Sequence, residues 1–390
     1  MSRVLVIIID GVGIGALPDA SEYGDDESAT LQHIAEATGG LHLPVMEKLG
    51  LGKIMTINGV RHDGPAQAAY GKMHEVSAGK DSTTGHWELA GLISEKPFPT
   101  YPQGFPKSVI RRFKDMTGYE VLGNKPASGT EIIKELGMQH LRTGKPIVYT
   151  SADSVFQIAA HQEVISLDHL YDLCQIAREM LQGEHAVSRV IARPFVGDNP
   201  DNFKRTVYRK DFSLEPNGSI LHLNLKNAGI LTVGIGKIND LYALKGITEN
   251  LYTKSNQEGM ETIIKAMHQY QDGFIMANLV DFDMLWGHRN DPRGFYRGLQ
   301  EFDDWLNQLL SVLKDDDLVI ITSDHGNDPT TPSTDHSREY VPVLAFGPTY
   351  KKDVNLGIRR TFADLQATVA DYFHIESTGW GTSFLPEIKT

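Results

Sequence analysis

The chain has 390 residues, too long for one typical domain, and its length suggests two. Hydrophobic residues make up 41% of it and charged residues 22%, as in an ordinary globular protein with a large core. The formal net charge is −13 and no run of Lys and Arg forms a basic patch, so we expect no nucleic-acid partner. No stretch approaches the ~18 apolar residues of a membrane span, so we expect no membrane partner.

Strands and helices alternate at both ends of the chain. The first apolar run, residues 4–9, is too short for a signal peptide and predicts a strand in a cytoplasmic protein. Further strands are expected at 230–235, 274–280 and 318–322, and helices at 30–36, 44–49, 259–270, 299–313 and 362–373. Such alternation is typical of an α/β fold in which helices cover a largely parallel sheet.

The middle of the chain has a different composition. Prolines are dense just before residue 106, and turn residues surround Pro216. The elements expected between them are strands at 146–150 and 187–192 and a helix at 167–181 with Ser166 as its N-cap. We therefore predict that residues 98–215 form a second α/β domain, inserted into a first domain made of residues 1–97 and 216–390.

Acidic and histidine side chains follow three of the expected strands. The six candidates for metal ligands are Asp10, Asp283, His288, Asp324, His325 and His336. In open α/β sheets, ligands bind where the carboxyl ends of the strands meet. Six oxygen and nitrogen ligands without sulfur suit two divalent ions such as zinc or manganese. Two such ions, about 3.5–4 Å apart, clamp the attacking and leaving oxygens of a phosphoryl transfer.

Taken singly, these residues have simpler explanations. An Asp after a strand, such as Asp10, is most often a helix cap or turn former, and His288 could be a loop residue with a hydrogen bond. Asp283 and His288 are five residues apart, about 140° out of register on an α-helix, so we expect a loop to bring them together. Their joint pattern favours a metal site. The only cysteine, Cys174, excludes a disulfide and a Cys-based zinc site, and we expect it to pack in a helix.

A candidate nucleophile lies in the segment from Ser77 to Glu88. It offers three hydroxyls, Ser82, Thr83 and Thr84, in a Gly-flanked turn close to Lys80 and His86. A hydroxyl held on a divalent metal becomes a competent nucleophile near neutral pH. The alternative is a helix cap, in which Ser82 or Thr84 caps a helix that begins near His86.

Longer motifs resemble those of the phosphopentomutases, a family of the alkaline phosphatase superfamily. They are Asp10-Gly-Val-Gly-Ile-Gly, Gly79-Lys-Asp-Ser-Thr-Thr-Gly-His-Trp-Glu88, Asn124-Lys-Pro-Ala-Ser-Gly-Thr-Glu131, Tyr149-Thr-Ser-Ala-Asp153-Ser, Val190-Ile-Ala-Arg-Pro-Phe195, Asn278-Leu-Val-Asp-Phe-Asp283 and Asp324-His-Gly-Asn-Asp328. The resemblance implies an alkaline-phosphatase-like core, an inserted cap domain for substrate binding and two Mn²⁺ ions. It also implies interconversion of ribose or 2-deoxyribose 1-phosphate with the 5-phosphate through a phosphorylated enzyme hydroxyl, with a sugar bisphosphate as priming activator.

The resemblance also implies roles for single residues. Asp10, Asp324 and His325 would surround one ion, and Asp283, His288 and His336 the other. Ser82 occupies the nucleophile position, where the family usually has threonine. The contacts to the pentose phosphate fall on Asp153, Arg193, Arg209 and Lys237, and nothing beyond its charge supports Arg205.

Two other functions stay open on the residues alone. A metal-dependent phosphatase or phosphodiesterase would pass the phosphoryl group to water. A non-catalytic protein would only bind metal or sugar phosphate. The inserted domain favours the mutase, because it could hold a pentose phosphate and exclude water during the second transfer.

Overall fold

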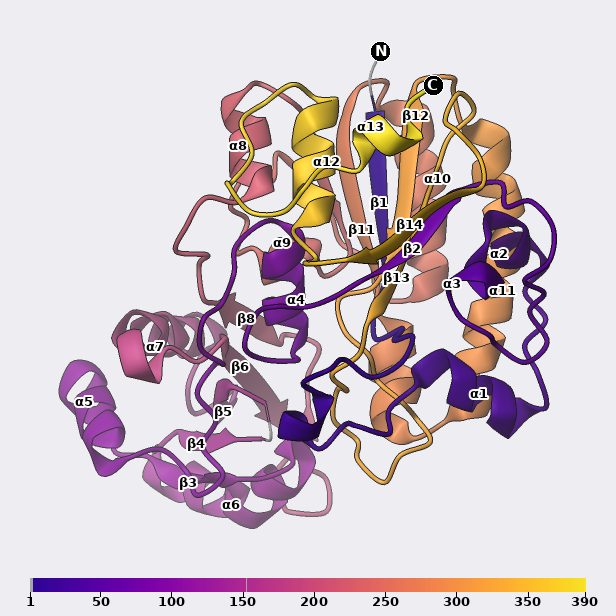
Figure 1. The fold of residues 1–390 in the computed structure, drawn as a ribbon. Helices are drawn as coiled ribbons and strands as arrows, with labels where there is room; N and C mark the ends of the chain where they lie inside the picture. The colour runs from indigo at the N-terminus through magenta and orange to yellow at the C-terminus, as the bar shows by residue number, and fades with distance from the viewer. Residues whose placement is uncertain (1–2, 152) are drawn as a thin grey trace. The chain divides into compact units, whose positions relative to one another are not determined.

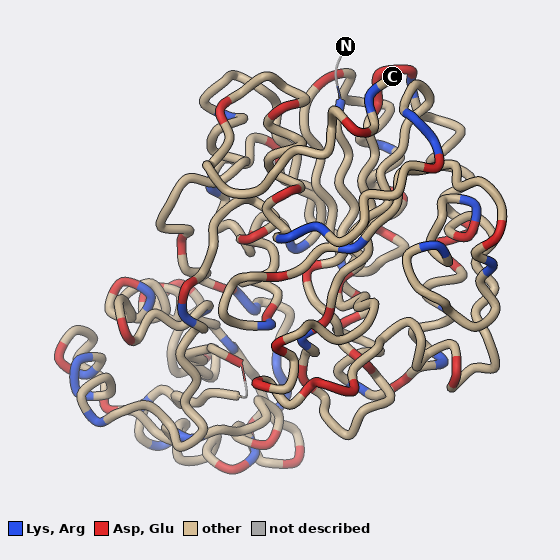
Figure 2. The backbone as a smooth tube through the Cα atoms, viewed as in Figure 1, with Lys and Arg blue, Asp and Glu red and all other residues tan. Residues whose placement is uncertain are grey.

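The computed structural model describes residues 3–151 and 153–390 (Figure 1). The chain divides into two compact units. The larger unit combines the chain up to Lys96 with Pro216–Thr390, and the smaller unit is Pro97–Glu215. Basic and acidic residues are interspersed along the chain in both units (Figure 2). Within the described ranges, no helix combines the length and apolar character needed to cross a membrane.

The larger unit is built on a sheet that has eight strands among the described residues, in the order β10-β9-β11-β1-β12-β13-β2-β14. Their bounds are β1 Arg3–Ile9, β2 Ala69–Met73, β9 Thr232–Ile235, β10 Glu249–Leu251, β11 Gly273–Leu279, β12 Asp317–Thr322, β13 Val341–Phe346 and β14 Val354–Arg359. β1 pairs in parallel with β11 and β12, and every residue of these three strands is buried. Burial on both faces explains why they read as continuous apolar runs.

Helices cover both faces of this sheet (Figure 1). On one side lie α1 Thr30–Thr38, α2 Pro44–Leu49, α3 Leu51–Ile54, α10 Asn256–Gln269 and α11 Pro292–Val312, and on the other α4 Ser82–Leu89, α8 Leu221–Asn227, α9 Ile238–Leu241 and α12 Asp364–Tyr372, with α13 Leu385–Ile388 near the chain end. Leu5, Ile7 and Ile9 of β1 pack into a core cluster with apolar residues of the first group. The predicted fold class, a largely parallel sheet covered by helices, is confirmed.

The parallel strands end at one edge of the sheet, which positions the site. β1, β9, β11 and β12 point the same way, so the residues that follow them lie at the same edge. Asp10 follows β1, Lys237 comes two residues after β9, and Asp324 comes two residues after β12. Among the described strands of this sheet β13 runs the opposite way, since it is antiparallel to both of its neighbours, β12 and β2.

The smaller unit has its own sheet and its own core. Its strands among the described residues are β3 Leu122–Pro126, β4 Ile147–Thr150, β5 Val155–His161, β6 Arg189–Val196, β7 Lys204–Arg205 and β8 Lys210–Ser213, and its helices are α5 Lys107–Thr117, α6 Gly129–Thr143 and α7 Leu167–Met180. Ser166 caps α7 as predicted, since its side chain accepts a hydrogen bond from the backbone N–H of His169. Cys174 is buried in α7, where burial raises the pKa of its thiol, so its expected packing role is confirmed.

Candidate metal centre and nucleophile

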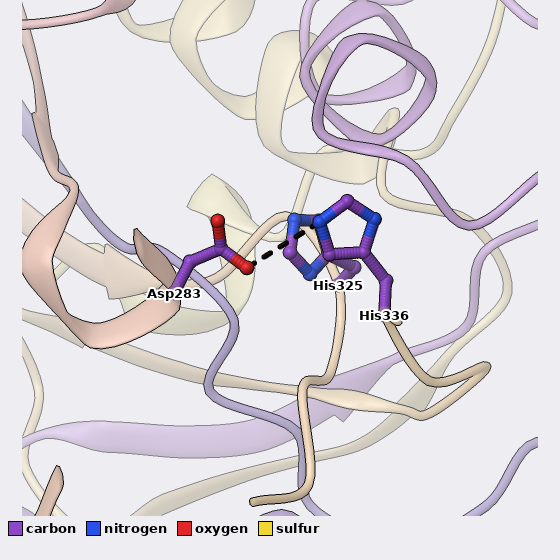
Figure 3. A group of neighbouring side chains, drawn as sticks. All are labelled: Asp283, His325 and His336. Atoms are coloured by element: carbon purple, nitrogen blue, oxygen red, sulfur yellow. Dashed lines mark ion pairs between the residues drawn. The ribbon is translucent and has the colours of Figure 1, made fainter. Parts of the chain in front are cut away.

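Two clusters of potential metal ligands form at the carboxyl edge of the larger sheet. Within the described residues, Asp10, Asp324 and His325 make one cluster, and Asp283, His325 and His336 make the other. All five side chains are buried, and the ligand atoms of each cluster lie within 4.8 Å of one another. His325 belongs to both clusters. Figure 3 shows its ring beside that of His336, with the Asp283 carboxylate facing them, and the two ring planes are tilted by 39° with their centroids 4.0 Å apart.

The first cluster is centred on one imidazole nitrogen. The Nε2 atom of His325 lies 3.3 Å from Asp10 Oδ1 and 3.2 Å from Asp324 Oδ2. β12 and the turn after it bring Asp324 and His325 to the same place, although neighbours on a regular strand point to opposite faces. The structure therefore gathers the three side chains assigned to the first ion.

His288, which the resemblance assigns to the second ion, lies beside the second cluster. His336 Nε2 lies 3.3 Å from Asp283 Oδ1, and His288 Nε2 lies 3.2 Å from Asp283 Oδ2. The expected loop between Asp283 and His288 is wrong. The segment is instead a π-helix, Phe282–Trp286, followed by a 3₁₀ turn, Gly287–Arg289. The π-helix carries Asp283 and the 3₁₀ turn carries His288, and together they place the two side chains in contact.

Hydrogen bonds to backbone carbonyls fix the orientation of two of the histidines. His288 Nδ1 lies 2.7 Å from the carbonyl of Thr334, and His325 Nδ1 lies 3.0 Å from that of Gly326. A carbonyl only accepts, so each Nδ1 carries a proton and donates it. The Nε2 atoms that face the carboxylates are then available to a metal, as is usual for histidine ligands.

The charges of the first cluster shift each other's pKa. Burial raises the pKa of the Asp324 carboxyl, but the neighbouring His325 and His86 outweigh burial and lower it overall. Burial lowers the pKa of His325, yet Asp324 and Asp10 raise it to about 10. A protonated His325 thus balances the carboxylates in the protein alone, and a divalent cation could supply that positive charge instead.

In the second cluster, too, neighbouring histidines lower the pKa of a buried carboxyl. Both clusters also contain buried polar atoms that a cation could satisfy. Burial raises the pKa of Asp283, but His336 and His288 lower it well below its ordinary value. Among the described residues, Asp10 Oδ1 and His336 Nε2 are buried without a hydrogen-bond partner. Unpartnered buried atoms of this kind are costly unless a ligand satisfies them. The residues present therefore fit two divalent ions.

Ser82 lies directly against the first cluster. Its Oγ atom is 3.1 Å from His325 Nε2 and 3.4 Å from Lys237 Nζ. The expected start of the helix near His86 is wrong, because α4 begins at Ser82 itself. Its cap is neither Ser82 nor Thr84. The Asp81 side chain accepts the backbone N–H groups of Thr83 and Thr84 and leaves the Ser82 hydroxyl to the cluster.

Gly85 lets the nucleophile helix approach the metal ligands. A Cβ atom on Gly85 would lie 1.9 Å from the backbone oxygen of Asp324, a distance that no real contact allows. Gly85→Ala should therefore push α4 away from Asp324, lowering kcat by at least about tenfold and stability by about 1–3 kcal/mol. Steady-state kinetics and urea unfolding measure the two effects.

Gly64→Ala is the control for this variant. Gly64 has φ +91°, and a Cβ atom added to it would meet nothing within 4 Å, so the substitution strains a loop backbone alone. It should lower stability and leave kcat unchanged. An unchanged kcat in Gly85→Ala would contradict the packing argument.

The predicted substrate contacts are divided between the two units. Lys237 belongs to the larger unit, with its Nζ atom 3.6 Å from Asp10 Oδ2. Asp153, Arg193 and Arg209 belong to the smaller unit. Arg193 on β6 donates from Nε to Gln157 at 3.0 Å, and burial lowers its pKa to about 10. Arg209 donates to both carboxylate oxygens of Asp211, at 2.7 and 2.6 Å.

Arg205, which no sequence pattern supported, acts on the same tyrosine as Arg193 and Arg209. Burial raises the pKa of the Tyr149 phenol. The nearby positive charges of Arg193, Arg205 and Arg209 lower that pKa but do not outweigh burial. The Tyr149 hydroxyl is buried without a hydrogen-bond partner in the described part of the chain. β6 carries Arg193 and pairs with β7, which carries Arg205, and with β8, which begins just after Arg209, an arrangement that no local pattern reveals.

Comparisons with known proteins place the chain in a class and then in a family. A model described as the metalloenzyme superfamily matches residues 2–377. The PH0037 protein from Pyrococcus horikoshii shares the fold, with a TM-score of 0.50 and 14% identity over 96% of this chain and 97% of that one. The fold and the clustered ligands thus define an α/β metalloenzyme of the alkaline phosphatase type.

The phosphopentomutase of Dictyoglomus turgidum is 58% identical over 389 residues, which cover 100% of this chain and 98% of that protein. The phosphopentomutase of Caldanaerobacter subterraneus is 57% identical over 388 residues, with coverage of 100% and 98%. The chain belongs to the phosphopentomutase family. The predicted enzyme class, an isomerase that moves a phosphoryl group within a pentose phosphate, is confirmed.

Proposed function

We propose that the enzyme interconverts ribose 1-phosphate or 2-deoxyribose 1-phosphate with the corresponding 5-phosphate, and that Ser82 carries the phosphoryl group between the two transfers. One observation supports Ser82 above all: its hydroxyl lies 3.1 Å from His325 Nε2, the atom nearest both carboxylates of the first cluster. A hydroxyl at that place can share a cation with Asp10 and Asp324.

Six side chains would hold two divalent ions. Asp10, Asp324 and His325 would hold one, and Asp283, His288 and His336 the other. Manganese suits this set of carboxylates and imidazoles. When bound, the ions would supply positive charge for the transferring phosphoryl group and favour ionisation of the nucleophile.

Ser82 would accept and return one phosphoryl group in each cycle. Phospho-Ser82 gives its phosphoryl group to the free hydroxyl of a pentose monophosphate, so that the Oγ–P bond breaks as the new sugar O–P bond forms. The resulting bisphosphate returns its other phosphoryl group to Ser82. A sugar bisphosphate added from outside would load the enzyme in the same way. Ser82 opens α4, and a helix N-terminus favours a negatively charged group.

Four residues are proposed to contact the pentose phosphate. Lys237, beside Ser82, would contact the reacting phosphoryl group, and Asp153, Arg193 and Arg209 of the smaller unit would bind the rest of the substrate. A guanidinium matches a phosphate with two parallel hydrogen bonds, which supports a role for the arginines. We place this chemistry in the cytoplasm, where small pentose phosphates would be its partners.

Arg193→Ala should weaken substrate binding and spare the metal centre. We expect KM for ribose 5-phosphate to rise at least about tenfold, because a charge-assisted hydrogen bond is worth about 1.5–3 kcal/mol. Mn²⁺ affinity should stay within about twofold of the unaltered enzyme. Arg142→Ala, which removes an exposed arginine of α6 in the same unit, should change neither value. Loss of Mn²⁺ affinity in Arg193→Ala would contradict its assignment to the substrate.

One assay separates the proposed activity from its two alternatives. The enzyme is incubated with Mn²⁺, a catalytic amount of sugar bisphosphate and ribose 1-phosphate, and the products are resolved. Ribose 5-phosphate supports the mutase. Free ribose with inorganic phosphate would show a phosphatase, and unchanged substrate would show a protein that only binds.

A further inference from the structure

Two buried asparagines each donate a hydrogen bond to a carboxylate of the metal clusters. Asn278 lies on β11, and its Nδ2 atom is 3.0 Å from Asp10 Oδ2. Asn327 follows the turn after β12, and its Nδ2 atom is 2.6 Å from Asp283 Oδ1. Both asparagines are 1% exposed. Each of the two clusters therefore has one carboxylate held by one amide.

The orientation of these amides follows from the chemistry of their partners. An ionised carboxylate only accepts hydrogen bonds, so the NH₂ group of each amide must face it. The Oδ1 atoms of Asn278 and Asn327 are buried, and neither accepts a hydrogen bond from any described residue. Donation to Asp10 and to Asp283 is thus the main polar contact that these side chains make.

Asn278 also connects the first cluster to the nucleophile through His86. The Nδ1 atom of His86 lies 2.8 Å from the Ser82 carbonyl and 3.1 Å from Asp324 Oδ2. Both of these atoms accept, so Nδ1 carries the proton. Asn278 Nδ2 lies 3.4 Å from Nε2, the other nitrogen of the ring. The two N–H groups of one amide are thereby directed to Asp10 and to His86.

We propose that Asn278, His86 and Asn327 are positioning residues for the metal centre. Asn278 holds Oδ2 of Asp10 and leaves Oδ1, which has no hydrogen-bond partner among the described residues, for a cation. His86 ties Asp324 to the backbone of Ser82. The network therefore fixes two ligands of one ion and the nucleophile in one arrangement. This inference rests on the proposed metal centre.

The test uses Asn278→Leu, which keeps the size of the side chain and removes its donors. Loss of a partner that orients a ligand typically lowers metal affinity by about 10–100-fold. We expect Mn²⁺ titration calorimetry on the metal-free variant to show that loss at one of two sites. Saturating Mn²⁺ should restore much of the activity. The urea midpoint of the metal-free protein should also fall, because the buried Asp10 carboxylate loses a hydrogen-bond donor, so Mn²⁺ affinity is the measurement that separates this variant from its control.

Asn239→Leu is the matched control. Asn239 is also fully buried at this edge of the sheet, but its amide donates to the backbone carbonyl of Gly234. It should lower the urea midpoint and leave Mn²⁺ affinity unchanged. Asn327→Leu provides a second, independent variant and should weaken the other ion by a similar factor.

The outcomes distinguish this inference from the proposed function. Two Mn²⁺ ions in the unaltered enzyme, bound equally tightly by Asn278→Leu and Asn327→Leu, would overturn the inference and leave the function standing. Failure of the unaltered enzyme to bind Mn²⁺ would overturn the proposed metal centre and the inference with it. A poorly folded Asn278→Leu leaves the decision to Asn327→Leu.

Discussion

Replacement of Ser82 by alanine is expected to abolish mutase activity, by about 10⁴-fold or more, which is the scale on which the loss of a covalent nucleophile acts. The Ser82 hydroxyl lies against the cluster, at 3.1 Å from His325 Nε2. The Thr84 hydroxyl instead donates to Asp81 at 2.6 Å. Without Ser82, the phosphoryl group has no place to stay between the two transfers. Product formation from ribose 1-phosphate measures the loss.

Ser82→Thr is the control for the nucleophile. It keeps the hydroxyl and the backbone and adds only a methyl group, so substantial activity should remain. Mn²⁺ stoichiometry should stay at two in both variants, since the six proposed ligands are untouched. Phosphopeptide mapping after exposure to a sugar bisphosphate should find label on Ser82. Label on Thr83 or Thr84, together with an active Ser82→Ala enzyme, would contradict the assignment.

The central strands of the larger sheet could be predicted from the sequence because their signal is contained in a few consecutive residues. Strands buried on both faces must be apolar throughout, so β1, β11 and β12 are visible as short runs without alternation. Polar residues that follow such runs stand out against them. Asp10 and Asp324 were recognisable for this reason, and the parallel order of the strands brings them together.

Other strands were missed because their pattern is weak or their pairing is distant. The sequence of β2 is Ala-Tyr-Gly-Lys-Met, which has little strand character. It nevertheless pairs with β13 and β14, two strands that lie far along the chain. β7 has only two residues. Arg205 lies on it and meets Arg193 and Arg209 only through sheet pairing, so no local spacing could have indicated it.

Local chemistry also misled where two signals competed. Ser82, Thr83 and Thr84 all have good capping side chains, but the cap is the preceding Asp81. The π-helix after Asp281 was equally hidden, because an i to i+5 turn has no distinctive composition. In both places the departure from the simplest expectation lies at the candidate site, where strain and special geometry are concentrated.

His336→Ala is expected to remove one of the two ions. His336 Nε2 is buried, lies 3.3 Å from Asp283 Oδ1 and has no hydrogen-bond partner within the described ranges, so a ligand is the best explanation for its position. Mn²⁺ titration should give a stoichiometry near one, and activity should fall at least about a hundredfold, because the two ions act as one clamp. Binding at a hundred times its Kd stabilises a protein by about 2.7 kcal/mol for each site. The variant should lose that increment of unfolding free energy in the presence of Mn²⁺ and lose little stability in the presence of a chelator.

His33→Ala is the control, because His33 contacts Asp328 at 2.5 Å, outside both clusters. It should leave the stoichiometry at two. Two ions bound to His336→Ala would show that the second cluster is built from other ligands.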